Sequence, residues 1–247
     1  ERPMKLGAAL RLVSTDLGAL FPRGEAGKYW FLLLASLALQ AAFWYVATPG
    51  PSLLRLAPQV PLSAFNSVAW SVLLLLLIPA ALYRALIGPL KGAGLRVGDW
   101  RFGLAAVVPL ALAAALLMVL VSGDPTLTAT YPWPGSWAGT SLGSLALWLV
   151  VYALYYLAFE AFYRGFVIDV ARRVVSPTAA IWLSVVMATL VHLGKPLAEV
   201  MAAAPVSVLF AVLAVRSRSI LYPMLLHLTF GFALDLAVLA RSGHLLN

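Results

Sequence analysis

The sequence lacks cysteine altogether, since none of its 247 residues is one. Disulfide bonds, thiolate metal ligands and a cysteine nucleophile are therefore excluded. Charged residues are also scarce at 11% of the chain, whereas hydrophobic residues make up 63%. So few charges and so much apolar surface exclude an ordinary soluble globule and indicate a polytopic helical membrane protein.

Long apolar stretches predict the fold. A helix of about 20 residues crosses a hydrocarbon core of about 30 Å. The stretches are rich in Leu and Ala and lack the alternation of outer-membrane barrel strands, so we expect an all-α transmembrane bundle. The seven expected spans, of which the fifth and sixth are short, cover about 28–47, 66–86, 104–122, 140–163, 178–194, 199–215 and 219–240.

The basic residues are distributed unevenly between the two sides of this bundle. Of the 17 Lys and Arg residues, 13 fall on the side of the N-terminus and three on the other, the last being Arg164 inside a span. The positive-inside rule then places the N-terminus in the cytoplasm. Basic loops beside anionic lipid account for the net charge of +8, and no nucleic-acid-binding motif is present, so no nucleic-acid partner is expected.

The chain is expected to form one transmembrane domain, 28–247, preceded by a cytoplasmic interfacial helix within 1–27. Arg11 and Asp16 lie off the apolar stripe of this helix, which is typical of a helix lying on a leaflet. The stripe consists of Leu6, Leu10, Val13, Leu17 and Leu20.

The composition, rich in Ala, Leu, Gly and Arg, indicates a high-GC bacterium, so we expect the bacterial cytoplasmic (inner) membrane.

Glu160 and Arg164 lie four residues apart in the fourth span, on one helical face. A charge at membrane depth is costly unless it is paired or hydrated, so both are candidates for a functional site. Tyr156 extends the polar stripe by one turn. Because Glu160 is the only carboxylate well inside the first six spans, it is the candidate general base. A structural ion pair that holds one helix in place is the alternative.

His192 is predicted on the last turn of the fifth span, where Gly194 and Pro196 break the helix. An isolated histidine at this place is typically an ordinary interfacial residue, but the other polar residues of the chain favour a functional one. Lys195 and Glu199 are expected to pair across the break, where they fix the turn or position a substrate.

In the seventh span, His227, Gly231 and Asp235 share one face about 12 Å long. Gly231 leaves a notch where backbone or substrate can approach. Asp235 is interpreted as orienting a histidine or binding water, or simply as a polar residue near a helix end. Since Glu160 and His227 each lie on the order of 12–18 Å from the cytoplasmic boundary, we expect them to converge with His192 on one site.

These motifs, in this order on consecutive spans, resemble the CPBP (Abi) family, which contains type II CAAX prenyl endopeptidases and bacteriocin-processing intramembrane proteases. The resemblance covers about 94–240. It rests on Glu160-x-x-x-Arg164-Gly165, on His192 in His192-Leu193-Gly194-Lys195-Pro196-Leu197-Ala198-Glu199, on His227 after Tyr222-Pro223, and on the connector Gly94-Leu95-Arg96-Val97-Gly98-Asp99-Trp100.

The resemblance implies a glutamate-dependent endopeptidase, in which a carboxylate activates a water that attacks the peptide carbonyl. It implies that Glu160 is this carboxylate, that Arg164 orients it, and that His192 and His227 bind the water and the oxyanion. No cofactor is expected. The implied partner is a membrane-anchored substrate, and a myxosortase-type C-terminal tail or a bacteriocin leader is preferred over a prenylated CAAX-like tail, which a bacterium need not contain.

Two positions depart from the family pattern. The first of its usual paired glutamates falls on Phe159, and its Asn or Asp four residues after the last histidine falls on Gly231. Either Glu160 has become the base, with Asp235 as the replacement partner, or the chain is a non-catalytic member; we favour the first. Phe159, rotated about 100° from Glu160 around the helix, is expected to face packing and not the site.

Three alternatives come from other classes of protein. A zinc protease would use Glu160, His192 and His227 as ligands, but the H-E-x-x-H spacing that pre-organises such ligands is absent. A transporter or a non-enzymatic scaffold would use the same residues to relay protons or hold a partner helix. A serine protease based on Gly139-Thr140-Ser141-Leu142-Gly143 is rejected, because that elbow requires a strand-to-helix turn.

Overall fold

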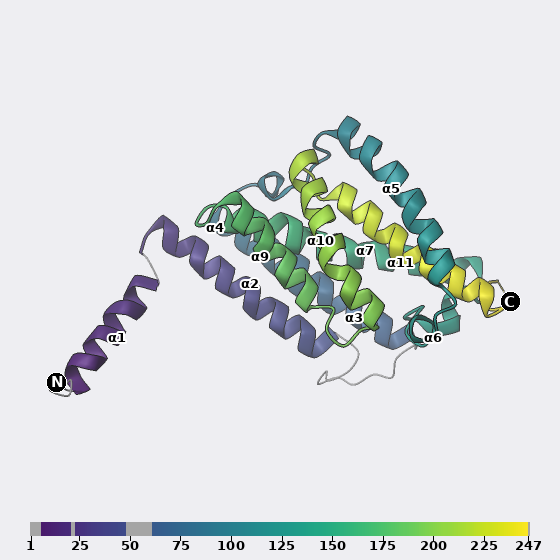
Figure 1. Cartoon of the computed structure of the whole chain (residues 1–247), viewed down its shortest axis with the longest axis horizontal. Coiled ribbons are helices and arrows are strands. Elements are labelled where there is room, and N and C mark those ends of the chain that lie inside the picture. Colours follow the sequence, from purple (N-terminus) through teal and green to yellow (C-terminus); the bar gives the residue numbers. More distant parts are fainter. Residues whose placement is uncertain (1–5, 21–22, 48–60, 247) are drawn as a thin grey trace.

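The computed structural model describes residues 6–20, 23–47 and 61–246, and this part of the chain contains helices and no strand (Figure 1). Six helices are long and apolar enough to cross a membrane, which confirms the polytopic helical bundle. They are α2 (Glu25–Ala47), the continuous helix α3, η1 and α4 (Pro61–Ser71, Val72–Leu77 and Ile78–Leu86), α5 (Trp100–Val121), the continuous helix α7, η4 and α8 (Leu142–Glu160, Ala161–Val167 and Ile168–Ala171), α10 (Leu197–Ser217) and α11 (Leu221–Arg241).

The fifth of the seven predicted spans was expected to be short, and this is confirmed. Helix α9 (Pro177–Leu190) has only 14 residues, or about 21 Å at 1.5 Å per residue, because the chain turns at 191–196. It nevertheless lies where the fifth span was predicted and runs alongside α10 (Figure 1). The sixth span, predicted to be short, is the full-length helix α10 of 21 residues.

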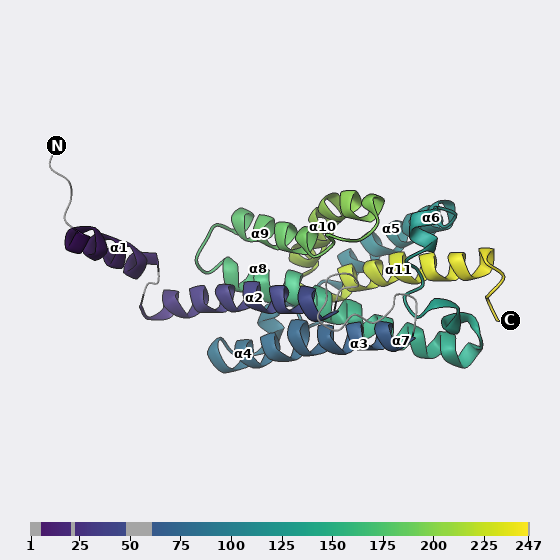
Figure 2. The same ribbon diagram turned by 90° about the horizontal axis from the view of Figure 1, so that it is seen from below.

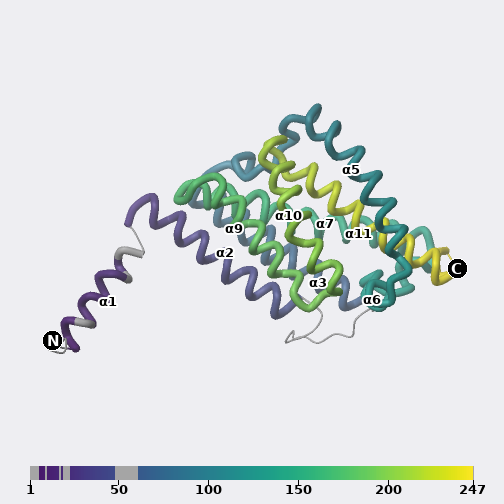
Figure 3. Tube along the Cα trace, viewed as in Figure 1, coloured from purple at the N-terminus to yellow at the C-terminus, as the bar shows by residue number. Residues whose placement is uncertain are grey.

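The fourth membrane helix (α7, η4 and α8) is the centre of the bundle. Every residue from Ala158 to Ala171 is buried, which is expected only of a helix surrounded by others on all sides. Helix α11 packs against both α5 and α7, while α10 packs against α9. Figures 2 and 3 show α9 and α10 side by side along one side of the bundle.

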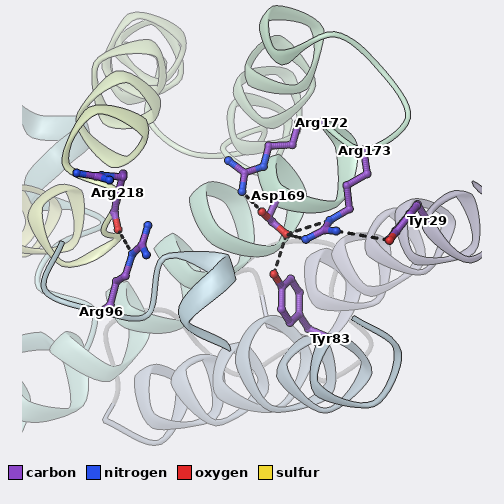
Figure 4. A network of polar contacts seen from close by, with 7 residues as sticks. All are labelled: Tyr29, Tyr83, Arg96, Asp169, Arg172, Arg173 and Arg218. Carbon is purple, nitrogen blue, oxygen red and sulfur yellow. Dashed lines mark hydrogen bonds and ion pairs between the residues drawn. The ribbon is translucent and has the colours of Figure 1, made fainter. Parts of the chain in front are cut away.

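This helix is longer than predicted, since it continues from 163 to Ala171 before Pro177 opens the next helix. Asp169 therefore lies inside it and is buried. The prediction that Glu160 is the only carboxylate well inside the first six spans is wrong. Figure 4 shows Asp169 bonded to Tyr83 of α4 and to Arg172 and Arg173 just beyond α8.

The segment η4 is a π-helical stretch that starts directly after Glu160. A π-helical turn holds more residues than an α-helical one and is frequent at functional sites. Here it separates Glu160, the last residue of α7, from Arg164 in the middle of the wider turn.

Helix α1 (Leu6–Leu20) stands apart from the bundle in Figures 1 and 2, joined to the start of α2. Leu6, Leu10 and Val13 are exposed on it, as an apolar stripe facing a bilayer surface would be. The helix itself is confirmed. Its position on a leaflet stays a prediction. Residues 1–5 and 21–22 of the predicted 1–27 segment lie outside the described residues, as do the side chains of Leu17 and Leu20.

Two short connections precede and follow α5 in the chain. The 3-10 turn η2 (Leu90–Ala93) leads into the connector 94–99. After α5, the chain forms α6 (Pro125–Thr128) and the 3-10 turn η3 (Gly135–Gly139) before α7 begins. Ser141 is the N-cap of α7 and forms a capping box with Ser144, so this serine ends a loop and starts a helix, in agreement with the rejection of a serine-protease elbow.

Candidate active site

Glu160 and His227 are in direct contact, as their predicted depths require. Nδ1 of His227 on α11 lies 2.7 Å from Oε1 of Glu160 at the end of α7, and the Glu160 side chain is 0% exposed. An ionised carboxylate only accepts hydrogen bonds, so Nδ1 carries the hydrogen in this pair. The other ring nitrogen, Nε2, is then the one available for further chemistry.

Arg164 approaches the second oxygen of the same carboxylate without bonding it closely. Its Nε lies 3.4 Å from Glu160 Oε2, which makes an ion pair, while neither atom has a hydrogen-bond partner among the described residues. The guanidinium is held from the other side by Ser184 of α9, whose Oγ accepts from Nη1 at 3.1 Å and donates to the Tyr163 carbonyl at 2.8 Å. Oε2 is thus the oxygen of Glu160 left for a water or substrate.

Aromatic rings enclose His227 on several sides. The Tyr156 ring lies 4.2 Å from the imidazole and the Phe210 ring of α10 lies 5.0 Å from it, measured between centroids. Tyr156 occupies the notch predicted at Gly231: a Cβ added there would lie 2.0 Å from the Tyr156 hydroxyl oxygen. Gly231 therefore gives room to a tyrosine of the protein itself.

His192 lies in the turn that follows α9, two residues beyond the helix end at Leu190, and not on the last helical turn where it was predicted. Its Nδ1 is 2.7 Å from the Ala188 carbonyl oxygen. Because a carbonyl only accepts, Nδ1 donates and Nε2 is again the remaining nitrogen. That Nε2 lies 3.9 Å from Oε1 of Glu199.

Lys195 and Glu199 pair as predicted, with Nζ donating to Oε1 at 2.7 Å. Burial alone would lower the pKa of Lys195, which lies in the connection before α10, but the Glu199 carboxylate raises this pKa above its usual value. Tyr131 donates its hydroxyl to the other Glu199 oxygen at 2.6 Å, and the Lys195 ammonium lies 5.1 Å from the ring centroid of Trp133. The loop before α7 thereby fastens onto the turn that carries His192.

Phe159 does not face away from this site, and the expectation that it faces packing alone is corrected. Its ring stands edge-on to both imidazoles, 5.2 Å from His227 and 5.9 Å from His192. The reason is the central position of the helix: α11 approaches it from one direction and the α9–α10 turn from another, so side chains 100° apart on it each meet a histidine. Glu160, Phe159 and the two histidines therefore form one cluster.

Asp235 is not brought to either histidine. Its Oδ2 accepts from the indole Nε1 of Trp148 on α7 at 2.7 Å, and Oδ1 has no hydrogen-bond partner among the described residues. Eight residues of helix separate it from His227 by about 12 Å, which is too far for contact. The interpretation that Asp235 orients a histidine is corrected: it binds the tryptophan at the other end of α7.

Several residues of this site have no signal in a charge or motif pattern. Ser184, Phe210 and Trp148 are ordinary residues of apolar helices, and only the packing shows what they contact. Tyr131 and Trp133 belong to an aromatic, Pro-rich loop whose composition indicates burial at an interface but not a bond to Glu199. Asp169 is different, because an acidic residue three and four positions before Arg172 and Arg173 is a recognisable helical pairing pattern.

The described residues contain no group of three His, Asp or Glu side chains arranged to hold a metal ion. Glu160 and His227 are close, but His192 turns Nδ1 to the Ala188 carbonyl and its ring packs against Phe159. The zinc alternative thus gains no support from the donor geometry.

Residues 141–233 match the family model described as Type II CAAX prenyl endopeptidase Rce1-like. This segment contains Glu160, Arg164, His192 and His227, and the match confirms the predicted resemblance to the CPBP family. No curated protein and no solved structure matches the chain.

Proposed function

We propose that this multi-pass membrane protein with an Rce1-like segment is an intramembrane endopeptidase that uses Glu160 to activate water. The substrate class is a membrane-anchored peptide or protein, such as a C-terminal sorting tail or a bacteriocin leader. The observation that carries the proposal is the 2.7 Å contact between His227 and the fully buried Glu160, inside the segment that matches the endopeptidase family.

The contacts around Glu160 support a general-base role. Oε1 is held by His227, whereas Oε2 faces the Arg164 guanidinium at 3.4 Å and has no hydrogen-bond partner among the described residues. A water on Oε2 attacks the peptide carbonyl carbon while its proton passes to Glu160. The C–N bond then breaks as Glu160 returns that proton to the amine nitrogen.

The two histidines are suited to assist the hydrolysis through Nε2, because Nδ1 of each ring is already hydrogen-bonded. In the neutral ring Nε2 accepts a hydrogen from water, and in the protonated ring it donates to an oxyanion. His227 is fixed by Glu160 and His192 by the Ala188 carbonyl, so neither ring needs to reorient to use Nε2.

A second candidate is a non-catalytic protein that binds membrane peptides. It is favoured by one observation: Phe159 is 2% exposed and its ring stands against both imidazoles, in the space where a substrate would meet them. Cleavage therefore requires this ring to move, whereas binding elsewhere in the bundle does not.

One experiment separates the two. The full-length protein is reconstituted in liposomes with a library of membrane-anchored peptides, and cleavage is followed by mass spectrometry for wild type, Glu160→Gln and Phe159→Glu. Glu25→Gln, which removes a carboxylate exposed outside the bundle, is the matched control. We expect cleavage by wild type and Glu25→Gln and a loss of about 10³-fold in Glu160→Gln, with Phe159→Glu lowering both rate and stability.

Equal rates for Glu160→Gln and wild type would refute the base. A silent wild type beside an active Phe159→Glu variant would establish the non-catalytic protein. Every reaction is run with and without a chelator of metal ions, because a rate that collapses on chelation would favour the zinc alternative.

A further inference from the structure

Four arginines gather where the connector 94–99 meets the turn between α10 and α11. Arg96 donates from Nε to the backbone carbonyl of Arg218 at 2.9 Å, which places both arginines at the end of α10 (Figure 4). Arg101 and Arg216 lie close by on the adjoining turns of α5 and α10, and all four are exposed.

The backbone that carries Arg96 and Arg218 is held firmly. Asp99 donates its N–H to the Ser217 carbonyl at 2.7 Å, and Ile220 donates to the Gly94 carbonyl at 3.0 Å. Gly98 has a positive φ of 63°, and a Cβ on it would lie 2.1 Å from the Ser217 carbonyl oxygen. The two segments therefore pack backbone against backbone, so the arginines are presented by a rigid support.

The positive charge of this surface is not balanced within the described part of the chain. The ion pairs among the described residues involve none of the four arginines. The nearest acid in sequence, Asp99, accepts from the N–H of Phe102 and caps α5. By contrast, Arg172 and Arg173 at the same end of the bundle share Asp169.

Exposed apolar side chains lie between these arginines. Val97 is 58% exposed and Trp100 is 54% exposed, and they alternate with Arg96 and Arg101 along the chain. Tryptophan at the end of a membrane helix is typical of the headgroup level of a bilayer. A surface that offers guanidinium forks beside apolar side chains matches a phosphodiester attached to a glycerol and acyl chains.

We propose that Arg96, Arg218, Val97 and Trp100 form a binding site for the headgroup of an anionic phospholipid. The arginines bind the phosphate oxygens, while Val97 and Trp100 contact the adjoining apolar part of the lipid. Free phosphate shares the charged chemistry but has nothing to place against these two side chains. This site is separate from Glu160 and does not depend on the proposed proteolysis.

The test uses the full-length protein in detergent with a titration of phosphatidylglycerol, and bound lipid is counted by native mass spectrometry. We expect the apparent affinity to fall about 25-fold in the double variant Arg96→Gln, Arg218→Gln, or about fivefold per arginine. The control Arg84→Gln, Lys91→Gln removes two exposed basic residues from the same end of the bundle and is expected to stay within about twofold.

Arg218→Gln alone keeps the backbone carbonyl that Arg96 contacts, so it tests the site without removing that hydrogen bond. A fivefold loss in this variant with an unchanged melting temperature supports the site. Equal losses in the control pair and the double variant would overturn it, because binding would then be a property of net charge. Displacement of the lipid by millimolar inorganic phosphate would also overturn it, since free phosphate would be the ligand.

Discussion

Two buried carboxylates on the fourth membrane helix, Glu160 and Asp169, look alike in sequence but differ in how fully they are bonded. Each has an arginine four residues later, and each is paired with it. Asp169 also accepts from Tyr83 at 2.7 Å and pairs with Arg172, so both its oxygens are occupied. Glu160 has one strong bond, to His227, and a second oxygen without a hydrogen bond.

This difference indicates what each carboxylate is for. Asp169 ties α8 to α4 and, through Arg173 beside Tyr29, to α2 at one end of the bundle. A carboxylate with every oxygen bonded has no capacity left for a reactant, whereas a half-bonded one does. The comparison predicts that changes around Glu160 affect rate and that changes at Asp169 affect stability.

After Glu160 itself, the largest effect is expected at the histidines. His227→Ala removes the only hydrogen bond that the described residues make to the Glu160 carboxylate, and His192→Ala removes the second imidazole against Phe159, so each is expected to lower turnover by about 10²-fold or more. His244→Ala is the matched control, since this third histidine is exposed and its Nδ1 lies 3.0 Å from the Ser242 hydroxyl oxygen. Turnover in liposomes is the measurement, and the His227 prediction fails if His244→Ala and His227→Ala lose the same activity. Added zinc is expected to change neither rate.

An intermediate effect is expected at Asp169. Asp169→Asn leaves two arginines without their shared partner, but their side chains are 49% and 34% exposed, so water replaces part of the loss. We expect a cost of about 2 kcal/mol and a melting temperature lower by about 4–8 °C, with cleavage retained below that temperature. Asp16→Asn on α1 is the control, and a stable but inactive Asp169→Asn protein would contradict the comparison.

The smallest effect is expected at Ser184, which links Arg164 to the Tyr163 carbonyl. Ser184→Ala is expected to cost about 1 kcal/mol and to lower kcat by about fivefold while KM is unchanged, because Arg164 loses part of its support and the substrate does not. Ser36→Ala is a matched control, since Ser36 is equally buried but bonds a carbonyl of its own helix. A change confined to KM would show that Ser184 acts on substrate binding.

The pattern of apolar residues was enough to predict the helical bundle, and the four-residue spacing was enough to predict the Glu160–Arg164 and Lys195–Glu199 pairs. The break between the fifth and sixth spans was also predicted, but the helix ends at Leu190, before His192 and not after it.

Depth along each helix was enough to put His227 and Glu160 at a similar level, since 1.5 Å per residue is nearly invariant, but their contact also depends on how the helices pack. The neighbour that each side chain faces around its helix could not be predicted in the same way, because it depends on which helices surround that helix. Phe159 was therefore predicted to face packing, and Asp235 was predicted to contact a histidine. In the structure, Phe159 packs against His227 and Asp235 bonds Trp148.

The length of the helices was less predictable than their existence. Helix α9 ends early because of the turn at 191–196, and the fourth membrane helix continues to Ala171, where the charges that suggested a loop are satisfied by Asp169. Charge alone cannot distinguish an arginine in water from one that pairs back to its own helix.

The missing side chain at Gly231 has a consequence for how this sequence can change over time. The family pattern has Asn or Asp at this place, but here the Tyr156 hydroxyl lies 2.0 Å from where any Cβ would stand. A single substitution that places Asn or Asp there therefore forces a shift of a tyrosine that is packed against His227. Positions 156 and 231 are thus coupled, and a larger residue at 231 is expected to fit best when residue 156 becomes smaller at the same time.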